Sequence, residues 1–189
     1  MRRVPVWLLD VDGVINTRRP AWGARLSRGT ARSEGVDWPM RWAPGLIDRV
    51  RRLHGEGLVE VRWCTTWCAD ADALERLFGL PAFGRALGAG ALDGVDDTDA
   101  VKLAAARRVV AGGRRLVWTD DTAVPRAGAV FDELTGGGAG LLIRPHPRRG
   151  LRPRDLDRIE AFARARRARR RRDTASAAYR RAKVSDSYI

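Results

Sequence analysis

An apolar run near the start of the chain stops abruptly on two carboxylates, and this feature limits the possible folds most. The run covers Val4–Leu9 and is followed at once by Asp10 and Asp12. An unbroken apolar segment of this length is typical of a strand buried on both faces of a parallel sheet. It is too short, and meets charge too soon, for a signal peptide or a membrane span. We therefore expect a soluble, cytoplasmic protein with no membrane partner.

Further segments with strand and helix patterns alternate along the chain. We expect strands over residues 58–64, 115–118 and 139–144, and helices over residues 44–53, 70–78, 98–110 and from about 156 onward. Thr98 is the expected cap of the third helix. Residues 16–44 show no clean period and indicate an irregular loop or a small flap, and residues 84–97 indicate a loop. The alternation predicts an α/β fold of three layers with a mostly parallel sheet.

The length and the charge distribution suggest one domain with a basic extension. A chain of 189 residues fits one domain, which we place at residues 1–163, with a flap at about 16–43 and an Arg-rich extension at 164–189. The net charge is +13. Residues 144–189 hold sixteen basic and five acidic residues, while the preceding part holds twenty and eighteen. The extension is thus either a site for RNA or DNA or a solvated helix.

The two cysteines, Cys64 and Cys68, are too few for a disulfide framework. With only His54 and His146 elsewhere, a zinc site also lacks ligands. We interpret both as reduced thiols, with a redox pair as the alternative.

Polar residues follow three of the expected strands at the points where these strands end. They are Asp10 and Asp12, then Thr65 and Thr66, then Asp120 and Asp121. The carboxyl ends of parallel neighbours share one edge of a sheet, which is where such folds bind ligands. Carboxylates gathered there repel one another, so a divalent cation is expected, and oxygen ligands favour Mg²⁺. Lys102 begins the preceding helix and could reach the same edge.

Taken together, these motifs resemble those of the haloacid dehalogenase (HAD) superfamily. The resemblance rests on Asp10-Val11-Asp12-Gly13-Val14, Thr65, Lys102 and Asp120-Asp121, in that order. Residues 63–67, 118–121 and 142–151 are also similar to the HAD-like domain of the Swiss Army Knife RNA repair proteins. Each motif alone is compatible with an ordinary turn, helix cap or surface residue, so the inference depends on their joint occurrence.

The resemblance implies a role for each residue. Asp10 would be the nucleophile that forms an aspartyl-phosphate, and Asp12 would act as general acid and then general base. Thr65 and Lys102 would bind the phosphoryl group, with Thr66 as the alternative to Thr65. Mg²⁺ would be held by Asp10, the main-chain carbonyl of Asp12, Asp120 and Asp121.

The short insertions leave no room for a large cap domain, so we expect an open site. An open site and a basic extension favour a phosphatase that acts on nucleic-acid ends or nucleotides, as in RNA repair. A small phosphate ester is the alternative substrate, and a catalytically silent RNA-binding protein is the alternative function. Trp22, Trp38 and Trp42 in the flap either pack there or stack on a base. The sequence leaves the oligomeric state open.

Overall fold

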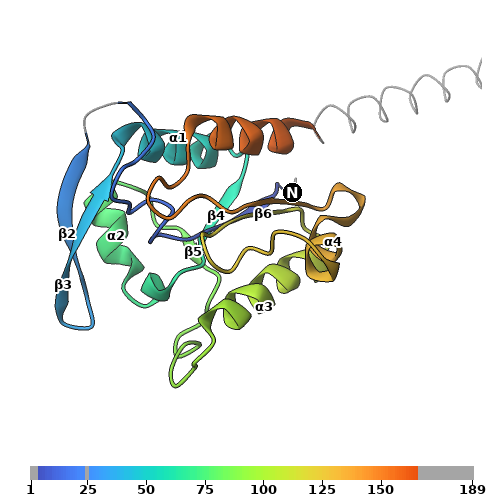
Figure 1. The fold of residues 1–189 in the computed structure, drawn as a ribbon, viewed down its shortest axis with the longest axis horizontal. Helices are drawn as coiled ribbons and strands as arrows, with labels where there is room; N and C mark the ends of the chain where they lie inside the picture. The colour runs from blue at the N-terminus through green and yellow to red at the C-terminus, as the bar shows by residue number, and fades with distance from the viewer. Residues whose placement is uncertain (1–3, 24–25, 166–189) are drawn as a thin grey trace, which may run out of the picture.

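A five-stranded parallel sheet is the centre of the computed structural model, which describes residues 4–23 and 26–165 (Figure 1). Its strands lie in the order β5-β4-β1-β6-β7, and all four neighbouring pairs are parallel. They are β1 (Val6–Leu9), β4 (Glu60–Trp63), β5 (Gly84–Arg85), β6 (Leu116–Thr119) and β7 (Gly140–Ile143). The predicted α/β fold with a mostly parallel sheet is confirmed.

The first strand lies in the middle of the sheet because every one of its side chains is apolar. All four residues of β1 are buried, as expected of a strand covered on both faces. Leu9 pairs with Trp63 of β4 on one side and with Thr119 of β6 on the other. Three neighbouring strands therefore end at the same level, and the residues that follow them share one edge.

Helices cover both faces of the sheet and complete the three layers. They are α1 (Pro44–Gly55), α2 (Ala71–Phe78), α3 (Thr98–Ala111), α4 (Ala129–Thr135) and a helical segment over residues 153–165. Figure 1 shows α1 and the segment 153–165 together on one face, and α3 and α4 on the other. Short 3-10 turns occur at η1 (Thr66–Cys68) and η2 (Gly136–Gly138).

The sequence-based expectation lacked helix α4 and strand β5. The link between β6 and β7 contains α4, which a crossover between parallel strands requires. This helix buries only Leu134, so it has no apolar period to detect. The expected loop at 84–97 begins with β5, which has two exposed residues.

The residue expected to cap α3 was also wrong. The Asp97 side chain, rather than that of Thr98, accepts a hydrogen bond from the Ala100 N–H at 3.0 Å at the start of this helix.

The segment expected to be an irregular loop or a small flap contains an antiparallel hairpin of β2 (Ser27–Ser33) and β3 (Val36–Trp42). The expectation of an irregular backbone was wrong. The turn residues Glu34 and Gly35 both have positive φ, 51° and 79°, which matches the tight turns that join such strands. In the hairpin only Ala31, Met40 and Trp42 are buried, so its alternation was too sparse to recognise.

Two of the three tryptophans around this flap are used for packing. The Trp22 indole donates a hydrogen bond to the Leu151 carbonyl at 2.7 Å, and Trp42 meets the Phe78 ring edge-on at 5.0 Å. Trp38 is 50% exposed. It is therefore the one of the three with a large free surface.

Cys64 and Cys68 are both buried free thiols. Burial raises the pKa of the Cys64 thiol, which disfavours the reactive thiolate and so the redox alternative.

Across residues 4–23 and 26–165, none of the helices combines the length and the apolar character needed to span a bilayer. Most of the predicted Arg-rich extension, from residue 166 on, lies outside the described residues.

Candidate functional site

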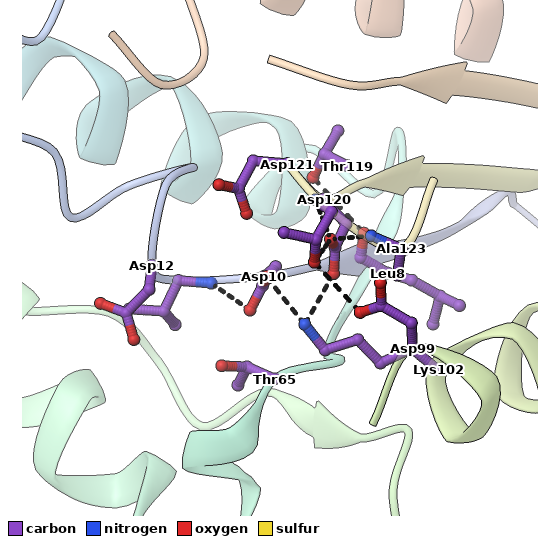
Figure 2. Close-up of polar contacts among 12 residues, drawn as sticks. Leu8, Asp10, Asp12, Thr65, Asp99, Lys102, Thr119, Asp120, Asp121 and Ala123 are labelled. Atoms are coloured by element: carbon purple, nitrogen blue, oxygen red, sulfur yellow. Dashed lines mark hydrogen bonds and ion pairs between the residues drawn. The ribbon is translucent and has the colours of Figure 1, made fainter. Parts of the chain in front are cut away.

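The edge where β1, β4 and β6 end gathers most of the residues singled out in the sequence (Figure 2). Asp10 directly follows β1, Asp120 directly follows β6, and Thr65 lies two residues beyond the end of β4. Lys102, a buried residue of α3, reaches the same edge and contacts Asp10 there. Every residue of β1 is apolar and β6 is apolar up to Trp118, so in both strands the polar residues come at the end of the strand. Strand β4 carries Glu60 and Arg62 but ends on the buried Trp63.

Lys102 forms a buried bridge between two of the aspartates. Its Nζ lies 2.9 Å from Asp10 Oδ2 and 2.7 Å from Asp120 Oδ2. All three side chains are almost fully buried. Ion pairs removed from water are strongly destabilised unless their geometry is good, so this cluster is a costly arrangement for a protein to keep.

Main-chain hydrogen bonds fix the two carboxylates further. Asp120 Oδ1 accepts from the N–H groups of Thr122 and Ala123 at 2.8 and 2.7 Å, and Asp10 Oδ1 accepts from the Val11 N–H at 2.8 Å. Each carboxylate therefore uses one oxygen for the backbone and the other for Lys102. The arrangement holds both side chains in one orientation.

Burial and neighbouring charges shift the pKa values of Asp10 and Asp120 in opposite directions. Burial raises the pKa of Asp10, and the neighbouring Asp120 charge raises it further. Burial alone would also raise the pKa of Asp120, but the charge and hydrogen bond of Lys102 hold it below its usual value. The pKa of Lys102 is raised because the two carboxylates outweigh its own burial. The ammonium therefore stays charged, and Asp10 is the group that keeps a proton most readily.

Asp121 adds a third carboxylate to the cluster. One oxygen each from Asp10, Asp120 and Asp121 lies within 4.8 Å of the others, and burial together with Asp120 raises the pKa of Asp121. With all three ionised, one lysine leaves an excess of two negative charges. That excess and the set of oxygen donors fit a divalent cation of the hard type. The cluster could therefore bind a metal ion.

Gly13 permits the close approach of Asp121. Its φ is +70°, and a Cβ at this position would lie 2.1 Å from Asp121 Oδ2. A larger residue would therefore both strain the backbone and displace a candidate metal ligand. The sequence predicted a turn here, but it gave no sign of the contact with Asp121.

The Asp12 side chain does not join this cluster. Its Oδ2 accepts from the Trp67 indole and its Oδ1 from the Asn16 amide, both at 2.8 Å. Figure 2 shows it on the side of Asp10 that lies away from Lys102. Asp12 is exposed, so its carboxylate is held in a fixed position and open to solvent.

The two threonines after β4 differ in placement. Thr65 is fully buried and its hydroxyl accepts a hydrogen bond from the Trp67 N–H at 3.4 Å. Figure 2 shows it beside Asp10. Thr66 is the first residue of η1 and is exposed. The geometry therefore favours Thr65 over Thr66 as a group that could meet a bound ligand.

No family model, curated protein or solved structure matches this chain. The resemblance to the HAD superfamily thus depends on the residues themselves and their arrangement.

Sequence reasoning missed the groups that orient the Asp12 carboxylate. Asn16 and Trp67 lie close in sequence to Asp12 and Thr65, but nothing in their spacing indicates that they meet. The one signal in the sequence was that Trp67 directly follows the two threonines after β4. Its sequence position does not indicate that its indole contacts Asp12.

Proposed function

We propose that this chain is a Mg²⁺-dependent phosphomonoester hydrolase of the HAD type, acting through an aspartyl-phosphate. The observation that carries the proposal is the buried contact of Lys102 with both Asp10 and Asp120. These residues come from three separate segments, and the resemblance assigns them the roles of nucleophile, lysine and metal ligand. A protein with only a structural role would gain little from burying such a cluster.

In the first step, a carboxylate oxygen of Asp10 attacks the phosphorus atom of the substrate. The bond from phosphorus to the leaving oxygen breaks as the new bond forms, which gives the aspartyl-phosphate. Lys102 orients Asp10 and supplies positive charge beside the reacting group. The buried Thr65 hydroxyl is positioned beside Asp10 to donate a hydrogen bond to a phosphoryl oxygen.

Asp12 transfers protons in both steps. Its protonated carboxyl gives a proton to the leaving oxygen, and its carboxylate then takes one from the water that attacks the aspartyl-phosphate. The products are inorganic phosphate and the free Asp10 carboxylate. The hydrogen bonds from Trp67 and Asn16 keep Asp12 near Asp10, while its exposure gives water access.

Asp10, Asp120 and Asp121 would hold the Mg²⁺. When bound, the ion would supply charge that offsets the negative charge of the phosphoryl group. The same three residues form the carboxylate cluster described above, which is what supports this assignment.

We propose nucleic-acid ends or nucleotides as the substrates, in an RNA repair-like role. Two observations support a large substrate. The general acid is exposed to solvent, and the described chain inserts only a two-stranded hairpin after β1 rather than a cap domain. A polymer end can therefore enter without being enclosed.

Hydrolysis of an aryl phosphate by the purified full chain tests the proposal. We expect turnover in Mg²⁺, no turnover in EDTA, and loss of turnover in Asp10→Asn. Asp72→Asn, which alters an exposed carboxylate on α2, is the matched control and should keep wild-type activity. Equal activity in Asp10→Asn would overturn the nucleophile assignment. Nucleic-acid binding without any hydrolysis would favour the catalytically silent alternative.

A further inference from the structure

A basic cavity of about 470 Å³ lies close to the edge of the sheet where β6 and β7 end. Its walls come from the segment after β6, from α4 and from the segment after β7. The volume is within the range that holds ordinary small ligands. No function has yet been assigned to it.

The lining of this cavity is strongly cationic. It includes four arginines and no acidic residue, namely Arg126, Arg144, Arg149 and Arg152. Arg152 is paired with Asp155 at 3.1 Å. The side chains of Arg126 and Arg149 are exposed and have no ion pair or hydrogen bond among the described residues. Two arginines are therefore available to an anionic ligand.

The apolar part of the lining suits a flat ring. Phe131, Pro145 and Pro147 contribute to the same walls as the arginines. The Phe131 ring offers a face on which a nucleobase can stack, while arginine binds phosphate oxygens. A ligand with both a phosphate and a base matches the lining better than an inorganic anion.

Direct hydrogen bonds connect the cavity to the carboxylate cluster. Arg144 Nε donates to the Asp121 carbonyl at 2.8 Å and Arg144 Nη1 to the Val124 carbonyl at 3.1 Å. The segment that carries Arg149 and Arg152 is also anchored, because the Leu151 N–H donates to the Val14 carbonyl at 3.0 Å. The cavity is thus held by the backbone segments that also carry the candidate site residues.

We propose that this cavity binds the nucleotide next to the phosphorylated end of an oligonucleotide, with its phosphodiester on Arg126 and Arg149. The inference rests on the proposed function and deepens it, because it names the substrate class. Asp121 lies in the same carboxylate cluster as Asp10, and its carbonyl accepts a hydrogen bond from the cavity residue Arg144. A substrate with its phosphoryl group at Asp10 would therefore extend towards the cavity. A mononucleotide has no second phosphate for these arginines, so a dinucleotide should be preferred.

The test compares thymidine monophosphate with the thymidine dinucleotide that carries the same terminal phosphate, at the 3′ end and at the 5′ end. We expect kcat/KM for the dinucleotide of the preferred end to exceed that for the mononucleotide by about tenfold, as two charge-assisted contacts would give. Arg126→Gln/Arg149→Gln should remove this preference. Arg148→Gln/Arg158→Gln removes the same charge from exposed arginines outside the cavity and should retain it.

Equal kcat/KM for the two substrates in the wild-type protein would overturn the inference, and so would an equal loss of preference in both double variants. If no substrate is hydrolysed, the proposed function fails, but fluorescence anisotropy still tests the cavity. Tighter binding of a labelled dinucleotide than of a labelled mononucleotide, lost only in Arg126→Gln/Arg149→Gln, would support it. Binding unchanged by that variant would overturn it.

Discussion

Two clusters of ion pairs in this protein have similar distances but opposite consequences. In the buried cluster, Lys102 meets Asp10 and Asp120 at 2.9 and 2.7 Å. In the surface cluster, Glu160 of the helical segment 153–165 meets Arg52 of α1 at 2.7 Å and Arg164 at 2.8 Å. The Glu160 side chain is 20% exposed, whereas that of Asp120 is 0% exposed. The two clusters differ in solvent exposure and in composition, because the surface cluster has two arginines around one carboxylate and the buried cluster has two carboxylates around one lysine.

At the surface, the charges satisfy one another. Hydrogen bonds from Arg52 and Arg164 lower the pKa of Glu160 to about 2. In the buried cluster, desolvation and a second carboxylate raise the pKa of Asp10. The surface cluster therefore fastens the helical segment 153–165 to α1, while the buried cluster retains unfavourable negative charge. Buried titratable groups with shifted pKa values are typical of binding and catalytic sites, so the buried cluster is better suited to binding a cation than to stabilising the fold.

The largest effect should come from removing the shared cation. Lys102→Met leaves two buried carboxylates without their partner, and we expect a loss of about 3 kcal/mol in the free energy of unfolding, measured in urea. The double variant Lys102→Met/Asp10→Asn should recover part of this loss because one buried charge is gone. A loss no larger than that of a surface pair would contradict the distinction between the clusters.

Metal binding should depend on pH through Asp10. Because its folded-state pKa is raised, the folded protein holds more protons than the unfolded chain, so without metal the Asp10 contribution to stability falls as pH rises above 3.8. Mg²⁺ must displace that proton, and its stabilising effect should therefore grow with pH. At a fixed Mg²⁺ concentration equal to 100 times the dissociation constant at pH 9, it should add about 2.7 kcal/mol at that pH. Thermal melts at pH 6 and pH 9 with and without Mg²⁺ measure this, and a larger effect at the lower pH would refute it.

Gly13→Ala should have an intermediate effect. The positive φ and the contact with Asp121 predict a loss of about 1–2 kcal/mol in folding stability, together with weaker Mg²⁺ binding. Gly35→Ala is a useful control, because its φ is +79° but nothing lies within 4 Å of an added Cβ. Both variants should lose stability, and only Gly13→Ala should lose metal affinity in calorimetric titration.

The smallest effect should come from the surface cluster. Glu160→Gln should cost no more than about 1 kcal/mol, because its partners Arg52 and Arg164 are 40% and 53% exposed and solvent screens such pairs. Because the pKa of Glu160 is lower in the folded protein than in the unfolded chain, its contribution to folding stability is present above pH 4.5 and is lost as the pH falls toward 2. Urea unfolding at pH 7 and pH 3 should show a difference between wild type and variant that shrinks at the lower pH. A constant difference would argue against an electrostatic origin.

The sheet was largely predictable because three of its strands, β1, β6 and β7, are almost entirely apolar. The run before Asp10 indicated the central strand, and the helical spacing of Leu46, Ile47, Val50 and Leu53 indicated the buried face of α1. Elements with little buried surface gave no such signal, as β5, α4 and the hairpin illustrate. Short elements are set by tertiary contacts rather than by local periodicity.

For the candidate site, the sequence indicated which residues meet but not how they interact. Convergence of Asp10, Lys102 and Asp120 followed from parallel strands ending together. The sequence did not indicate that Lys102 would pair with both carboxylates, nor that Asp12 would point away from them toward Trp67. Such details depend on side-chain directions, which spacing alone does not determine.

The bond from the Trp67 indole to Asp12 has a mechanical consequence. The Trp67 main-chain N–H donates to the Thr65 hydroxyl and its indole N–H donates to the Asp12 carboxylate, so both groups are held by the same residue. Substitutions at Trp67 should therefore alter the positions of the Thr65 hydroxyl and the Asp12 carboxylate together.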